Sequence, residues 1–249
     1  MLSDIKNQKF TENLKAYIKR FLNGSITDLD ESGTRIMINH FLTDVLGFTA
    51  LEEVRTEYMI KGTYADYMIQ VNGKRHFLVE VKSFSLNLNE NHLRQAINYG
   101  ANEGVEWALL TNGRQIELYR IMFEKPIRHE KVFSIALAND NVKSIAATLQ
   151  FLTKELVLKG GLDVLWNKTL ALTPESLSKI LLSYDMVNDL RKEVNKQFGT
   201  KFEVEDVQQT LVKIISDKID VSKIKVPKLN PPVKKAKPVQ PKSSESETN

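Results

Sequence analysis

The sequence of 249 residues contains no cysteine. It therefore has no disulfide framework, no thiolate ligand for a metal and no cysteine nucleophile, and this composition fits a reducing compartment. Long apolar runs are also absent, because no stretch approaches the ~20 apolar residues that a membrane-spanning helix needs. The first residues, MLSDIKNQKF, lack the apolar segment of a secretion signal. We expect a cytoplasmic protein that does not insert into a membrane.

Proline is scarce over most of the chain, because five of the seven prolines lie within residues 223–249. The same segment has seven lysines and two glutamates, a net charge of +5, so residues 1–222 carry −1 of the total charge of +4. Such a composition cannot bury enough apolar surface to order itself. The basic character of the protein therefore belongs to a tail. This tail either acts only as a solvating segment or is loosely attracted to a polyanion.

Length and composition favour one main domain with an appendage, since 42% of the residues are hydrophobic. We predict a first domain over residues 1–158, a helical region over residues 159–222 and the disordered basic tail over residues 223–249. The helical region has a start signal at Thr173-Pro174 and a stop signal at Gly199. Its apolar stripes are the expected surfaces for packing or for docking a protein partner.

Helical and strand periodicities alternate along the predicted first domain. We predict helices over about 8–22, from Asp28 or Asp30 to Gly47, and over about 89–102 and 139–158. Strands are predicted for the segments EEVRTEYMI, ADYMIQV, KRHFLVEVKSF, WALLTN, QIELYRIMF and, as a shorter edge strand, EKVFSI. Strands between helices on both sides in sequence predict an α/β (α+β) fold, in which a mixed sheet is covered on both faces.

One predicted strand carries two charges among apolar residues. In HFLVEVKSF, residues 76–84, Glu80 and Lys82 are two positions apart and therefore share a face of the strand, about 7 Å apart. The aliphatic and aromatic residues around them predict burial on both faces. Buried charges must be paired or bound to a metal, so this strand is the first candidate for a functional site.

A third charged residue, Asp66, lies on the opposing strand of the hairpin that turns at Asn72-Gly73. With a tight two-residue turn and a regular ladder, Asp66 faces Val79, and the two carboxylates diverge. A three-residue loop, or one β-bulge, instead places all three charged side chains on one face. A shared site therefore predicts an odd loop or a bulge.

Two carboxylates beside a lysine suit a hard divalent cation such as Mg²⁺, which takes few protein ligands and keeps several waters. Asp66, Glu80 and the carbonyl of Val81 are the candidate ligands, and Mn²⁺ is expected to substitute for Mg²⁺. Lys82 would orient or deprotonate the metal-bound water for attack on a phosphodiester. The alternative is a partly buried salt bridge that braces the hairpin, and the hairpin by itself leaves both possibilities open.

Asp66 followed by EVK at residues 80–82 resembles the D…(D/E)xK signature of the restriction-endonuclease-like nuclease superfamily. Its surroundings resemble the N-terminal nuclease domain of the motor (R) subunits of type I restriction enzymes. ESGTRIMINHFLTDVLGF is similar to the opening helix of that family, HLRQAINYG to its QxxxY helix, and EWALLTNGRQIELYR to its sheet-closing hairpin. Ala65 stands where the wider superfamily often has proline, and the chain has no GxxxxGK[ST] loop of a helicase motor.

The resemblance implies a restriction-endonuclease-like fold and metal-dependent hydrolysis of DNA by a stand-alone relative of that domain. It implies that Asp66 and Glu80 bind the metal and that Lys82 activates water. The further site residues are Glu31 as an auxiliary acid and metal ligand, Gln95 as a positioning residue, and Arg94, Tyr99 and Arg35 as nucleic-acid contacts. No feature of the sequence specifies a DNA target, so a protein partner bound through the C-terminal helices or the tail is a candidate for targeting.

A second hypothesis comes from another class of function. The chain would then be a non-catalytic nucleic-acid-binding or assembly module that retains the nuclease fold in a defence, repair or phage system. A third possibility is a purely structural protein. The complete set of Asp66, Glu80, Lys82 and Gln95 favours the catalytic hypothesis over both alternatives.

Overall fold

The computed structural model describes residues 1–60, 63–138 and 141–216. The tail predicted over residues 223–249 therefore lies outside the described residues. The chain divides into two compact units, Met1–Leu177 and the residues from Ser178 onward. The first unit extends past the boundary predicted after residue 158, because Leu162 and Leu165 belong to its core.

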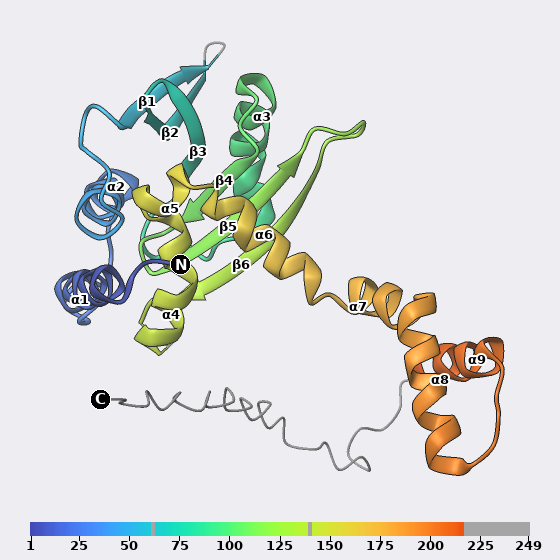
Figure 1. The fold of residues 1–249 in the computed structure, drawn as a ribbon. Coiled ribbons are helices and arrows are strands. Elements are labelled where there is room, and N and C mark those ends of the chain that lie inside the picture. Colours follow the sequence, from blue (N-terminus) through green and yellow to red (C-terminus); the bar gives the residue numbers. More distant parts are fainter. Residues whose placement is uncertain (61–62, 139–140, 217–249) are drawn as a thin grey trace, which may run out of the picture. The chain divides into compact units, whose positions relative to one another are not determined.

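The first unit is built on a six-stranded sheet whose strands follow their order in the sequence (Figure 1). The strands are β1 (Val54–Ile60), β2 (Thr63–Val71), β3 (Lys74–Val81), β4 (Trp107–Thr111), β5 (Gln115–Met122) and β6 (Arg128–Ala136). All neighbouring pairs are antiparallel except β3 and β4, which are parallel. The parallel pair needs a crossover connection, and a helix between the two strands supplies it. The predicted mixed sheet is confirmed.

Helices precede, interrupt and follow the sheet. In the first unit they are α1 (Asp4–Phe21), α2 (Glu31–His40), the π-helical turn η1 (Phe41–Val45), the 3₁₀ turn η2 (Glu90–Leu93), α3 (Arg94–Glu103), α4 (Val142–Leu149), the 3₁₀ turn η3 (Gln150–Leu152), α5 (Lys154–Leu158) and α6 (Gly161–Ala171). Helix α7 (Pro174–Leu181) spans the division between the units, and α8 (Tyr184–Phe198) and α9 (Val204–Ser216) follow. Among the described residues, none of these helices has the length and hydrophobicity to cross a membrane.

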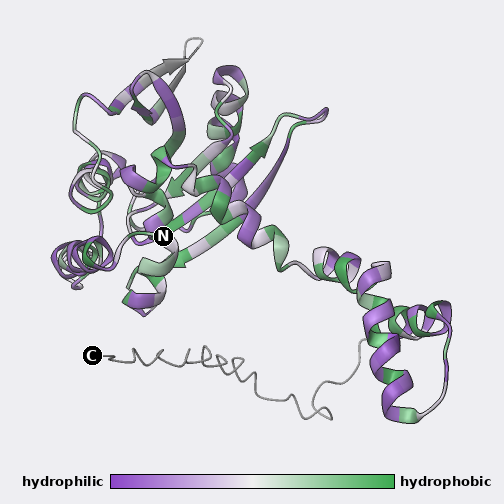
Figure 2. Ribbon diagram, in the orientation of Figure 1, coloured by the Kyte–Doolittle hydropathy of each residue, from purple (hydrophilic) through white to green (hydrophobic). Residues whose placement is uncertain are grey.

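The sheet is covered on both faces, as predicted. One face, which includes Ile69 and Val79, packs in a large apolar cluster with α1, α2, η1 and α4 to α6. The other face, which includes Met68 and Leu78, packs against α3 in two smaller clusters. Figure 2 shows hydrophobic residues along the central strands and mixed hydropathy on the surrounding helices. The strict separation of neighbouring residues into different clusters follows from the two-residue period of a strand.

Two predicted elements differ from the structure in extent. The helix predicted over 139–158 is divided, because the backbone of Thr153 is extended between η3 and α5. Its hydroxyl donates a hydrogen bond to the carbonyl of Gln150 at 2.6 Å. The predicted short edge strand is longer than expected, since β6 pairs with β5 from Arg128 to Ala136.

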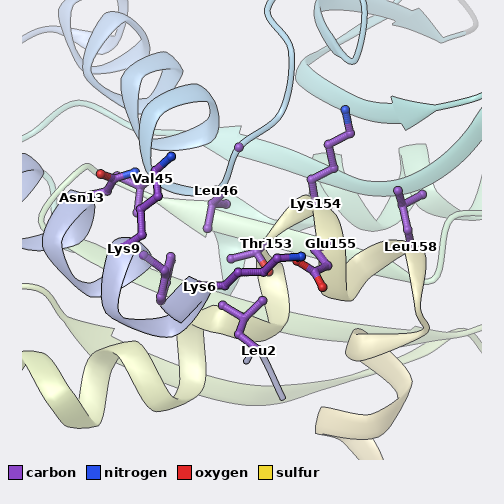
Figure 3. A pocket seen from close by; sticks show the side chains of 12 residues that line it. Leu2, Lys6, Lys9, Asn13, Val45, Leu46, Thr153, Lys154, Glu155 and Leu158 are labelled. Carbon is purple, nitrogen blue, oxygen red and sulfur yellow. The ribbon is translucent and has the colours of Figure 1, made fainter. Parts of the chain in front are cut away.

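A hollow of about 380 Å³ lies between α1, the end of η1 and α5 (Figure 3). Its floor is apolar, and several lysines surround it. Lys6 donates to Glu155 at 2.7 Å within the hollow, so the charged groups there already join α1 to α5. We assign a packing role to this region and no chemistry.

Candidate functional site

The β2–β3 hairpin has a tight turn followed by a break in register. Asn72 and Gly73 have positive φ angles of 50° and 77°, as a two-residue hairpin turn of this kind requires. The paired residues run Val71–Lys74, Gln70–Arg75, Ile69–Phe77, Met68–Leu78 and Tyr67–Val79. His76 is therefore the extra residue of a β-bulge on β3, and the expected bulge is confirmed.

The bulge decides which side chains can meet. The shifted register, continued by one residue beyond Tyr67 and Val79, brings Asp66 opposite Glu80, and Asp66 accepts a hydrogen bond from the amide of the next residue, Val81. Residues opposite each other in an antiparallel pair point to the same face. Asp66, Glu80 and Lys82 therefore share a face near the end of β3, where a regular ladder would have separated the two carboxylates.

Asp66 is held by two donors. Its Oδ2 atom accepts a hydrogen bond from the backbone amide of Val81 at 2.8 Å, and its Oδ1 atom accepts one from Nη1 of Arg35 at 3.3 Å. Burial raises the pKa of Asp66, and the negative charge of Glu31 acts in the same direction. The amide of Val81 and the charge of Arg35 oppose this shift.

Glu80 and Lys82 form an ion pair of 2.6 Å between Oε1 and Nζ. The exposed fractions of their side chains are 5% and 14%, so water screens the pair weakly. Burial raises the pKa of Glu80 to about 7, against the effect of Lys82 and with further contributions from Asp66 and Glu31. Burial alone would lower the pKa of Lys82, but the carboxylates around it, Glu80 first, raise it. The neighbouring carboxylates therefore favour the charged form of Lys82.

Glu31 is the first residue of α2, which begins as predicted at the Asp30 cap. The Asp30 carboxylate accepts a hydrogen bond from the amide of Gly33 at 2.7 Å. The charge of Glu31 contributes to the pKa shifts of Asp66, Glu80 and Lys82. The start of α2 is thus part of the electrostatic environment of the site.

The three site residues predicted on α3 differ from one another in how exposed they are. Arg94 and Gln95 are exposed at the start of the helix. Tyr99 is only 4% exposed and packs with Met68, Leu78 and neighbouring residues under α3. Its ring fills a core cluster, so the predicted contact of Tyr99 with nucleic acid is restricted to a small exposed surface.

The donor set fits a cation that takes few protein ligands. Asp66 and Glu80 are both buried enough for their pKa values to rise, and a divalent cation would relieve the repulsion between them. Within the described part of the chain, no group of three or more His, Cys, Asp or Glu side chains could hold a metal ion. The remaining ligands would have to be backbone oxygens, for which Val81 is the candidate, and water, as is typical of Mg²⁺.

The sequence interpretation missed the partner of Arg35. The exposed fraction of its side chain is 30%, and its guanidinium lies 3.3 Å from Asp66 and 3.8 Å from Glu57. One local signal placed Arg35 near the predicted site, because Arg35 follows Glu31 by four residues and shares a face of α2 with it. The cleft beside this ion pair has a volume of about 570 Å³ and lies between α2 and the first two strands.

A second buried carboxylate was also missed. Glu117 on β5 is 3% exposed and accepts hydrogen bonds from Gln115, Tyr119, Lys131 and Ser134. The signal in the sequence is again a charged residue within an apolar strand, in QIELYR. Because its hydrogen bonds come from two neighbouring strands, we assign Glu117 a structural role.

A mixed sheet covered on both faces carries two carboxylates of low exposure and a lysine where β2 and β3 meet, which is the arrangement that the resemblance found in the sequence implies. Residues 30–135 match the family model described as type I restriction enzyme R protein N terminus. This confirms, over these residues, the resemblance inferred from the sequence, and it supports a relationship to restriction nucleases. No curated protein and no solved structure matches the chain.

Proposed function

We propose that the first compact unit hydrolyses phosphodiester bonds in DNA with the help of Mg²⁺, for which Mn²⁺ can substitute. The observation that carries this proposal is the convergence of Asp66, Glu80 and Lys82 produced by the bulge at His76. A hairpin that needed only a brace would not require two carboxylates of raised pKa in one buried place.

Asp66 and Glu80 would hold the metal, together with the carbonyl of Val81 and an auxiliary contribution from Glu31. When bound, the metal supplies Lewis-acid stabilisation of the phosphate and lowers the pKa of a bound water. Binding would weaken the 2.6 Å pair between Glu80 and Lys82, because Glu80 would share its charge. The ammonium of Lys82 would then orient the attacking water and stabilise negative charge that develops on the phosphate.

The exposed start of α3 would contact the substrate beside these groups. Gln95 is the proposed positioning residue, and Arg94 is the first candidate for a phosphate contact, with Arg35 as a further candidate. Phosphate contacts orient a nucleic acid without reading its sequence. Targeting in the cytoplasm would therefore depend on DNA structure or on a protein partner that binds the C-terminal helices or the tail.

One observation favours the second candidate function, a nucleic-acid-binding or assembly module without catalysis. Both carboxylates of the site have cationic partners within the chain, because Arg35 contacts Asp66 and Lys82 contacts Glu80. In a protein that never binds a metal, these two ion pairs would be sufficient to neutralise both carboxylates.

Plasmid nicking distinguishes the two functions. The full chain is incubated with supercoiled plasmid in Mg²⁺, in Mn²⁺ and in EDTA, and DNA retention is measured in parallel by gel shift. The matched variants are Lys82→Met, which removes the site ammonium, and Lys6→Met, which removes a lysine from the exposed ion pair with Glu155.

A nuclease nicks the plasmid only with the metal, and Lys82→Met lowers the rate by at least about 10²-fold, whereas Lys6→Met has no effect. Retention of DNA in EDTA without products under any condition would support the binding module and overturn the proposed catalysis.

A further inference from the structure

Arg35 lies between two carboxylates that differ in their surroundings. Its Nη1 atom is 3.3 Å from Asp66, whose side chain is 11% exposed, and 3.8 Å from Glu57, whose side chain is 73% exposed. One carboxylate thus belongs to the buried site, and the other lies at its solvent side. The same Nη1 atom is within ion-pair distance of both carboxylates, so a small rotation of the side chain would move it nearer to one and away from the other.

The backbone on both sides of this ion pair is fixed. The hydroxyl of Tyr67 donates to the carbonyl of Arg35 at 2.7 Å, which ties this turn of α2 to β2. Glu57 has a φ angle of 47°, a left-handed conformation that non-glycine residues rarely adopt. It lies between the paired residues Thr56–Tyr67 and Tyr58–Ala65, so the ladder on both sides holds it there. The side chain of Arg35, which is 30% exposed and lines the cleft, has room to change position.

The cleft of about 570 Å³ gives the guanidinium a place to move. Arg35, Glu57 and Asp66 line this cleft together with the polar side chains of Ser32, Asn39 and Thr56. Of the two residues, Arg35 is the more accessible to a phosphodiester strand in this cleft, because its side chain is 30% exposed and that of Asp66 is 11% exposed. Arginine binds phosphate through the same planar set of donors that it offers to a carboxylate.

We propose that Arg35 is a latch on Asp66. Without metal, the guanidinium occupies the Oδ1 side of the carboxylate. With a divalent cation held by Asp66, the guanidinium of Arg35 would be repelled toward Glu57 and the cleft, and there it would bind a phosphate of the DNA. Arg35 would thereby couple metal binding to DNA binding, and this inference rests on the proposed metal site at Asp66.

Affinity for Mn²⁺ tests the latch without catalysis. Free Mn²⁺ is measured by electron paramagnetic resonance in titrations of the full chain and of Arg35→Gln, Arg35→Lys and Glu57→Gln. Arg128→Gln is the matched control, because it removes one arginine charge from an exposed ion pair with Glu124. Asp66→Asn reports whether the ion binds at the proposed site.

The latch predicts that Arg35→Gln binds Mn²⁺ about two- to fivefold more tightly, since a competing ion pair of partly exposed groups is removed. The Mn²⁺ affinity of Arg35→Lys lies between those of Arg35→Gln and the wild type. A general effect of charge would instead leave the affinity of Arg35→Lys equal to that of the wild type. Glu57→Gln weakens Mn²⁺ binding in the wild type but not in Arg35→Gln, as a double-mutant cycle shows for coupled residues. Arg128→Gln leaves the affinity unchanged.

A DNA measurement completes the test. In EDTA, a short duplex binds the wild type and Arg35→Gln equally, because the guanidinium is held by Asp66. In Ca²⁺, the wild type binds more tightly than Arg35→Gln, and its salt dependence is steeper by about one phosphate contact.

The outcomes separate the two proposals. Mn²⁺ binding that is absent, or insensitive to Asp66→Asn, overturns the metal site and the latch together. Mn²⁺ binding that depends on Asp66 but is unchanged or weaker in Arg35→Gln overturns the latch alone. Circular dichroism checks that each variant is folded. If Arg35→Gln does not fold, the Mn²⁺ affinities of Arg35→Lys and Glu57→Gln still test the latch.

Discussion

The carboxylate of Asp66 on β2 accepts a hydrogen bond from the backbone amide of Val81 at the end of β3, with 2.8 Å between Oδ2 and N. The bond joins the two strands beyond the last pair of their ladder, Tyr67 with Val79. It also orients Asp66 toward the strand that carries Glu80 and Lys82. A residue proposed to bind metal therefore has a structural role as well.

This double role predicts different effects for two substitutions. Asp66→Asn keeps an oxygen that can accept from Val81, whereas Asp66→Ala leaves a partly buried amide without a partner. We expect Asp66→Ala to be less stable than Asp66→Asn by about 1–3 kcal/mol in urea unfolding, while both variants lose DNA nicking. Equal stability of the two variants would show that the bond to Val81 does not contribute.

Metal binding predicts a stabilisation that depends on concentration. A ligand that binds only the folded state adds about 2.7 kcal/mol at a hundred times its dissociation constant. We expect Mn²⁺ to raise the Tm of the wild type and EDTA to reverse the effect. In Asp66→Asn and in Glu80→Gln the shift should disappear, and an undiminished shift in both would place the ion elsewhere.

The hydrogen bonds to Glu117 predict a dependence of stability on pH. Burial alone would raise the pKa of Glu117, but hydrogen bonds from Tyr119, Lys131 and Ser134 together lower it below 4.5. An acid with a lowered folded pKa stabilises the fold above its unfolded pKa, and this contribution is lost as the pH falls through the folded value. Glu117→Gln should therefore cost about 1.5–3 kcal/mol at pH 7.

The difference between Glu117→Gln and the wild type should shrink as the pH falls below 4.5, which urea unfolding at pH 7 and at acidic pH measures. Glu124→Gln, at an exposed carboxylate, is the matched control and should change stability by less than about 0.5 kcal/mol. A constant difference across pH would mean that the ionised carboxylate of Glu117 is not what stabilises the sheet.

Close packing beneath α3 predicts the effect of one added methyl group. A Cβ atom at Gly100 would lie 2.6 Å from the carbonyl oxygen of Val105 and 2.7 Å from Cδ1 of Ile121. The helix cannot approach the sheet as closely, so we expect Gly100→Ala to cost about 1–3 kcal/mol in chemical unfolding. Asn98→Ala, at an exposed position of the same helix, should be near neutral. A stable Gly100→Ala would mean that α3 can shift freely.

Several features of the site follow from local sequence. The Asn72-Gly73 turn and the Asp30 cap form as predicted, because both depend on the conformations and hydrogen bonds of a few neighbouring residues. The shared face of Glu80 and Lys82 follows from the period of a strand. The metal-binding and catalytic roles of these residues stay predictions.

The sequence left a regular ladder, a three-residue loop and a bulge open, and tertiary packing selects the bulge. In a regular ladder, Ile69 would pair with His76, and Phe77 would be opposite Met68. The bulge instead pairs Ile69 with Phe77, and both belong to the large cluster under α1 and α2. Met68 then pairs with Leu78, and both pack under α3. Burial of these side chains on the correct faces explains why His76 is the unpaired residue.

The sequence by itself determined the order of helices and strands, the tight turn and the presence of two acids and a lysine within one hairpin, because each depends on residues close together in the chain. Only the tertiary structure decided that Asp66 lies opposite Glu80, that Arg35 pairs with Asp66 and that Tyr99 is buried. These relationships depend on how two apolar faces of one sheet are covered by distant helices, and local patterns do not specify which contacts that packing produces.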